Sequence, residues 1–91
     1  MCHFRPVNVE PLTTVDNLFY FIGDVQSLIN EHSGERQYCT LRNNKVSAQF
    51  LFQSGREMPI DFEGRKVQVK AKLSVDRHGD VYFVVSGWKE L

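Results

Sequence analysis

The fold is decided by residues 66–75, which read KVQVKAKLSV. Polar and apolar side chains alternate strictly along this stretch, which is typical of a β-strand with one face buried and the other in water. The same alternation recurs at 46–52 and 81–85, and a β-rich composition predicts two further strands at 18–29 and 36–42. The sequence therefore predicts an all-β chain of five strands.

Turn-forming residues separate these strands. Asn43-Asn44 suits a tight hairpin, because Asn tolerates positive φ at both central positions. Residues 77–80 read as a second hairpin, and residues 30–35 as a longer first loop. The segment 53–64 contains glycine and proline without a helical period, so it holds at most a turn or two of helix.

Five strands with one long connection, between the third and the fourth, match the Greek-key barrel called the OB-fold. Gly23 lies in the middle of the long first strand, where a barrel strand must bend to pair with two neighbours. A small open antiparallel sheet would explain the pattern as well. We expect an OB-fold barrel over residues 18–91, preceded by an extended N-terminal arm at 1–17.

Length and composition indicate one small globular domain. The chain has 91 residues, of which 42% are hydrophobic and 24% charged, and this size folds alone with a modest core. No apolar run approaches the roughly 20 residues of a membrane-spanning helix, and the N-terminus does not read as a signal peptide. The expected location is therefore cytoplasmic.

The sequence offers no catalytic or metal-binding constellation. Cys2 and Cys39 are too few for a disulfide scaffold, and Cys39 sits where a small buried hydrophobe is expected. No pair of Cys or His residues has zinc-ligand spacing, and no glycine-rich phosphate loop precedes a helix. We expect no metal, no cofactor and no enzymatic activity.

The charge balance differs along the chain. Eleven basic residues equal eleven acidic ones in total, yet residues 35–77 hold nine basic and five acidic side chains. A protein without net positive charge does not generally coat nucleic acids, but a locally basic stretch can still attract phosphates. The middle of the chain is therefore where a nucleic-acid site is expected.

Five short motifs, in this order, resemble the N-terminal OB domain of the exodeoxyribonuclease VII large subunit. They are GDV at 23–25, YCTLRN at 38–43, the strand 46–52, GRKVQVKAKL at 64–73 and GDVY at 79–82. The resemblance implies binding of single-stranded DNA. We therefore expect a protein that binds single-stranded nucleic acid, DNA in preference to RNA, in replication, repair or recombination. It does not extend to that family's catalytic regions, so it implies no nuclease activity.

OB barrels bind single strands with a basic groove for the phosphates and aromatic rings on which bases stack. The expected face lies on strands 36–42 and 46–52, with the first and last loops at its rim. Tyr38 between two arginines is the best stacking candidate. The predicted nucleic-acid-binding residues are Arg36, Tyr38, Thr40, Arg42, Lys45, Gln49, Lys70, Lys72, Arg77 and His78.

Each of these residues also has a structural interpretation. Tyr38 could cover the barrel rim with its hydroxyl in water, and His78 could be plainly solvated. Lys66, Lys70 and Lys72 form a basic row on the outer face of their strand, which either extends the binding track or keeps that face soluble.

A second hypothesis is an OB-fold interaction module, or a subunit of a larger nucleic-acid-processing complex. Zero net charge and few outward aromatic residues on strands 36–42 and 46–52 favour it. Tyr20, Tyr82, Val84 and Trp88 have outward parity, which is more apolar surface than a monomer usually leaves bare. A homodimer or a partner protein is therefore expected at the surface around Trp88.

Overall fold

The computed structural model describes residues 12–15, 17–31, 36–44, 46–53 and 55–91. Six strands and one short 3-10 helix make up the regular structure of these residues. In chain order they are β1 (Leu12–Val15), β2 (Leu18–Glu31), β3 (Arg36–Asn43), β4 (Val46–Gln53), η2 (Ile60–Phe62), β5 (Lys66–Val75) and β6 (Val81–Glu90).

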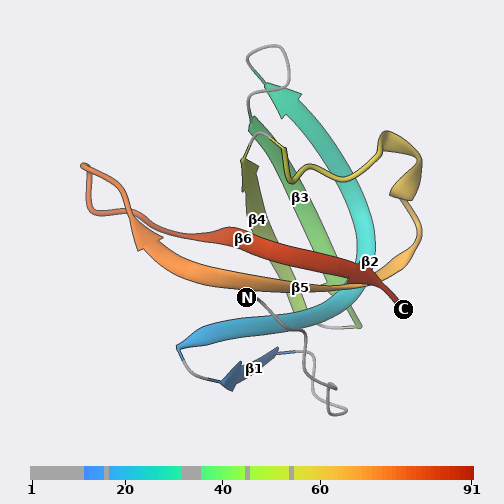
Figure 1. Ribbon diagram of the computed structural model, residues 1–91, viewed down its shortest axis with the longest axis horizontal. Helices are drawn as coiled ribbons and strands as arrows, with labels where there is room; N and C mark the ends of the chain where they lie inside the picture. Colours follow the sequence, from blue (N-terminus) through green and yellow to red (C-terminus); the bar gives the residue numbers. More distant parts are fainter. Residues whose placement is uncertain (1–11, 16, 32–35, 45, 54) are drawn as a thin grey trace.

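Five of the strands close into a barrel (Figure 1). Antiparallel pairs join β2 to β3, β3 to β4, β5 to β6 and β2 to β5. The closing contact is parallel, between β4 and β6, where Phe50 lies opposite Phe83 and Leu51 opposite Val84. This order, with only a short helical turn between β4 and β5, is the Greek-key OB-fold that the sequence predicts.

The first barrel strand, β2, bends so that it can pair with two different strands. Residues 19–24 of β2 pair with β5, and residues 24–31 pair with β3. A Cβ atom on Gly23 would lie 3.0 Å from both the Arg42 carbonyl oxygen and the Phe21 ring. Only glycine therefore fits at this bend without displacing its neighbours, as expected from the sequence.

The core consists of aromatic rings and the inward residues of β3 and β5. Phe21, Phe50 and Phe52 are fully buried, together with Cys39, Leu41, Val67, Val69 and Ala71. The Phe50 ring lies 5.5 Å from that of Phe21 and 5.3 Å from that of Phe83, in tilted arrangements that suit aromatic pairs. The inward positions near the middle of the alternating strands are thus confirmed. Val46, Leu73, Val75 and Val81 have the same parity, but they lie toward the strand ends and are exposed instead.

The connection between β4 and β5 packs against the barrel through buried hydrogen bonds. The Gln37 side chain donates to the Met58 carbonyl oxygen at 2.9 Å and accepts from the Met58 amide at 2.8 Å. Further along, the Glu63 carboxylate accepts a bond of 3.1 Å from the Leu28 amide, next to a bulge in β2. Both residues fix this connection in place.

Trp88 belongs to the same end of the barrel. Its ring packs edge-on against Phe62 of η2 at 5.0 Å, and its Nε1 donates to the Arg56 carbonyl oxygen at 3.0 Å. Trp88 also packs against the core, and Tyr20 is only 4% exposed. The expectation that Tyr20 adds to an exposed apolar surface is therefore wrong. Trp88 is half-buried and packs within its own chain.

Two local features differ from the sequence expectation. Residues 12–15 of the N-terminal arm form β1, which pairs with β2 so that Leu12 lies opposite Phe21 and Val15 opposite Leu18. Residues 1–11 and 16 lie outside the described part of the chain. In the β3–β4 hairpin Asn44 has positive φ, whereas Asn43 ends β3 and its side-chain amide donates to the Ile22 carbonyl oxygen. The turn therefore begins one residue later than expected.

The outer face of β5 is not an open row of lysines. Lys66 and Lys72 are exposed, but Lys70 is only 1% exposed and Gln68 is fully buried. Tyr20, which lies opposite Lys70 on β2, is buried as well. This part of the sheet is thus covered on both faces, and the placement of Lys70 on an accessible face is corrected.

No helix in the described residues is long and apolar enough to span a membrane.

Candidate nucleic-acid interface

A groove of about 910 Å³ lies between the outer face of β3 and β4 and the tip of the β5–β6 hairpin. The residues that line it come from both sides and from the strand that closes the barrel. They are Arg36, Tyr38, Gln49, Phe50, Leu51, Asp76, Arg77, His78, Asp80, Tyr82 and Phe83. This is the face on which OB-folds bind oligonucleotides and oligosaccharides.

One wall of the groove is set by the register of β3 and β4. Tyr38 lies opposite Leu51, and Thr40 opposite Gln49, so these side chains share the outer face. Cys39, between Tyr38 and Thr40, is fully buried on the opposite face. The alternation of β3 therefore places Tyr38 half-buried on the groove, with the exposed Arg36 two residues away on the same face.

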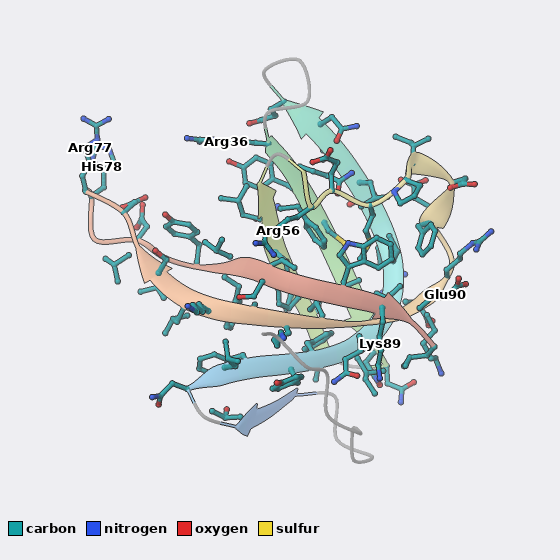
Figure 2. All side chains as sticks on the ribbon, viewed as in Figure 1. Arg36, Arg56, Arg77, His78, Lys89 and Glu90 are labelled. Carbon is teal, nitrogen blue, oxygen red and sulfur yellow. The ribbon has the colours of Figure 1, made fainter. Side chains whose placement is uncertain are left out.

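The other wall is the β5–β6 hairpin, whose tip is organised by Asp76. Its Oδ1 accepts hydrogen bonds from the amides of His78 at 2.8 Å and Asp80 at 3.0 Å. The Asp76 amide in turn donates to the Asp80 carbonyl oxygen at 2.9 Å, and Gly79 takes φ of 87°. This tight turn presents the exposed side chains of Arg77 and His78 at the end of the hairpin (Figure 2).

Tyr82 supplies a second aromatic ring to the groove. It lies on the same face of β6 as Val84, which is opposite Leu51, and Leu51 is opposite Tyr38. Strands in a sheet are about 4.8 Å apart, so β3 and β6 are separated by roughly 10 Å here. The two tyrosines can therefore contact different bases of one strand.

The sequence alone did not assign Tyr82 to the site, although its outward parity was visible. Only the parallel contact of β6 with β4 brings it to the same groove as Tyr38, and no local signal reveals that contact. Asp76 and Asp80 were also missed as groove residues, although both belong to the predicted hairpin.

The charges of the groove are mixed rather than uniformly basic. The lining contains the cations Arg36 and Arg77, the carboxylates Asp76 and Asp80, and His78. The arginines can form bidentate contacts with phosphates, and the carboxylates repel them. Such a lining suits moderate binding in which ring stacking carries a large share.

The structure brings some of the predicted binding residues to the groove and leaves others away from it. Arg36, Tyr38, Gln49, Arg77 and His78 line it. Among the other described residues, Arg42 donates from Nε to the Asn44 carbonyl oxygen at the β3–β4 hairpin, Thr40 and Lys72 are not part of the groove lining, and Lys70 is buried. Lys45 lies outside the described residues.

The residues that the structure describes include no group of three or more His, Cys, Asp or Glu side chains placed to hold a metal. Cys39 faces the core, and burial raises the pKa of its thiol to about 12. A thiol with so high a pKa is a poor nucleophile at neutral pH. The groove lining offers rings for stacking and polar and charged side chains for hydrogen bonding and ion pairing.

No protein-family model and no curated protein matches this sequence. A solved chain described as an aspartyl-tRNA synthetase, from Leishmania major Friedlin, matches in structure with a TM-score of 0.59, over 84% of this chain, at 20% identity. This chain spans 18% of the length of that one. At such identity the similarity shows the shared barrel fold, and none of these comparisons links the chain to the exodeoxyribonuclease VII large subunit.

Proposed function

We propose that this protein binds single-stranded nucleic acid in the groove between the β3–β4 face and the β5–β6 hairpin. The observation that carries the proposal is the presence of two rings, Tyr38 and Tyr82, on a groove that also holds Arg36 and Arg77. Rings that stack on bases, next to side chains that pair with phosphates, are the two requirements for binding a single strand. We propose binding without catalysis.

The proposal covers both DNA and RNA. The motif resemblance favours DNA and a role in replication, repair or recombination, whereas the structural match is to a protein named for tRNA. Rings stack on the bases of either polymer, and the choice between them depends on contacts to the 2′-hydroxyl. A parallel titration with both polymers separates the two.

The test is a fluorescence anisotropy titration with labelled strands of about 20 nucleotides, longer than the roughly 4 to 16 nucleotides that one OB-fold occupies. We expect single-stranded DNA or RNA to bind more tightly than duplex, with a logarithmic salt slope of about −0.7 for each phosphate contact. No binding of either single strand at low salt would refute the proposal.

A matched pair of arginine variants locates the site. Arg77→Ala removes one groove cation, so the salt slope should become shallower by about 0.7. Arg65 is also exposed but pairs with Glu90 at 3.3 Å, and Glu90 lies on the opposite side of the molecule from the Arg77 tip (Figure 2). Arg65→Ala should leave the slope unchanged. Equal effects of the two variants would argue against this groove.

A second candidate function is a protein-interaction module. The two aspartates in the groove favour it, because they oppose phosphate binding and could pair with basic side chains of a partner. If single strands fail to bind while a basic peptide binds and Asp80→Asn weakens that binding, this second function is the better one.

A further inference from the structure

The outer half of the β5–β6 hairpin extends beyond the barrel (Figure 1). β5 pairs with β2 only as far as Ala71, opposite Phe19, while its pairing with β6 continues to Val75. Among the described residues, no strand therefore covers the other edge of β5 from Lys72 to Val75. This segment is called the free edge below.

The backbone groups at the free edge can be assigned from the neighbouring hydrogen bonds. The Asp76 amide donates to the Asp80 carbonyl oxygen, and the Lys66 carbonyl oxygen accepts from the Leu91 amide. The even-numbered residues of β5 therefore direct their backbone N–H and C=O groups toward β6. Amide and carbonyl groups alternate direction along a strand. Leu73 and Val75 therefore direct their backbone donors and acceptors away from β6, toward the free edge.

Apolar side chains accompany these backbone groups. Leu73 is 50% exposed, Val75 61% and Val81 59%, and Val81 lies directly opposite Val75 on β6. All three share the inward parity of the barrel strands, but the hairpin carries them past the core that would cover them. An exposed edge with large apolar residues is a template for pairing with another strand.

The sequence of the free edge is complementary to itself. If two copies pair antiparallel with Ser74 opposite Ser74, then Leu73 lies opposite Val75 and Lys72 opposite Asp76, twice each about the two-fold axis. Leu73 and Val75 form hydrogen-bonded pairs in this register. Lys72 and Asp76 form non-hydrogen-bonded pairs, in which side chains approach most closely.

We infer that the free edge is a self-association surface, through which a second copy of this chain pairs antiparallel with Lys72–Val75. The basis for this occupant is its charge complementarity, because each Lys72 meets the Asp76 of the other copy. Pairing about an axis perpendicular to the sheet turns both groove faces to the same side. The dimer forms without nucleic acid, so the inference is independent of the proposed function.

The alternative is that Lys72 only protects a solvent-exposed edge, as charged residues on edge strands often do. If Lys72 only protects the edge, the protein stays a monomer. If Lys72 pairs with Asp76 of a second copy, the protein forms a dimer. Pairing four residues on each copy buries a small area, so a weak dimer that depends on concentration is expected.

The test is sedimentation equilibrium of the whole chain at low salt, over a range of concentrations up to about 1 mM. The wild-type protein should shift from the 10.6 kDa of one chain toward twice that mass. Lys72→Glu sets a Glu against Asp76 twice across the axis, so the dissociation constant should rise about tenfold or more. A protein that stays at 10.6 kDa throughout would overturn the inference.

Two further variants distinguish this edge from other dimer surfaces. Lys66→Glu makes the same charge change on an exposed residue of β5 outside the free edge, and it should dimerise like the wild type. Leu73→Lys puts a cation opposite Val75 and should abolish the dimer, while circular dichroism confirms that the barrel is folded. A dimer that survives both Lys72→Glu and Leu73→Lys would place the interface elsewhere, for example around Trp88.

Discussion

The Asp76 carboxylate accepts a 2.8 Å hydrogen bond from the backbone amide of His78. Together with the bond from the Asp80 amide to the same oxygen, this contact closes the turn that carries Arg77. A side chain at the end of one strand thus fixes the geometry of the groove wall that the proposed ligand would contact.

Replacing Asp76 with Ala should loosen this turn while the barrel stays folded. Both amides lose their acceptor, and we expect a local cost of about 1 kcal/mol. Hydrogen exchange should accelerate at His78 and Asp80. Asp76→Asn keeps an acceptor oxygen and is the control, because Asn forms the same kind of turn. Unchanged exchange in Asp76→Ala would show that the backbone alone holds the turn.

Removing either groove tyrosine should weaken binding of a single strand without changing stability much. Each stacked base contributes about 1 to 3 kcal/mol, so Tyr38→Ala and Tyr82→Ala should each weaken affinity from several-fold to more than a hundredfold. Ile60 is 65% exposed on η2 and does not line the groove, so Ile60→Ala serves as the control. If only Tyr38→Ala has an effect, Tyr82 is part of the wall but not a stacking surface.

The buried clamp between Gln37 and Met58 should contribute measurably to stability. Gln37→Leu leaves the Met58 amide and carbonyl without their partner in a site that is 2% exposed, and each such group costs about 1 to 3 kcal/mol. Chemical denaturation should therefore show a loss of about 2 to 6 kcal/mol in the free energy of unfolding. Gln26→Leu, at an exposed position of β2, should cost far less. Equal losses would assign the effect to the substitution itself rather than to the clamp.

The Cys39 thiol should make stability fall at alkaline pH. Burial raises its pKa from 9.0 to about 12, so the unfolded chain loses this proton at a lower pH than the folded one. The thiol's contribution is fully present below about pH 9 and declines by about 1.4 kcal/mol per pH unit between about pH 9 and 12. Denaturant titrations across that range should show this extra slope in the wild type and not in Cys39→Ala. The same slope in both proteins would contradict the assignment.

The alternation of apolar and polar residues predicted β4, β5 and the first half of β6, whereas β2 and β3 were predicted from their β-rich composition. In β3, β4 and β5 the burial of Cys39, Phe50 and Val69 follows the predicted parity. The extent of β6 was underestimated, since it continues to Glu90, because Ser86 and Gly87 interrupt the apolar pattern. The short β1 was missed since its four residues carry no alternation long enough to read.

The site was predictable where it depended on one strand or one turn. Tyr38, Gln49 and Arg77 could be assigned from strand parity or from a hairpin signal, and they line the groove. Tyr82 required the pairing of β4 with β6, which joins residues more than 30 positions apart. Lys70 was wrongly predicted to be accessible for a related reason. Its burial depends on what packs against that face of the sheet, which the alternation of its own strand does not show.

The central claim is that a single strand occupies the groove, and amide chemical-shift mapping tests it most directly. On titration of ¹⁵N-labelled protein with an unlabelled single strand, we predict the largest shifts at Tyr38, Leu51, Arg77, His78 and Tyr82. Residues at the opposite end, such as Phe62 and Glu90, should stay unchanged. Shifts concentrated around Phe62 and Glu90, or no shifts at all, would contradict the account.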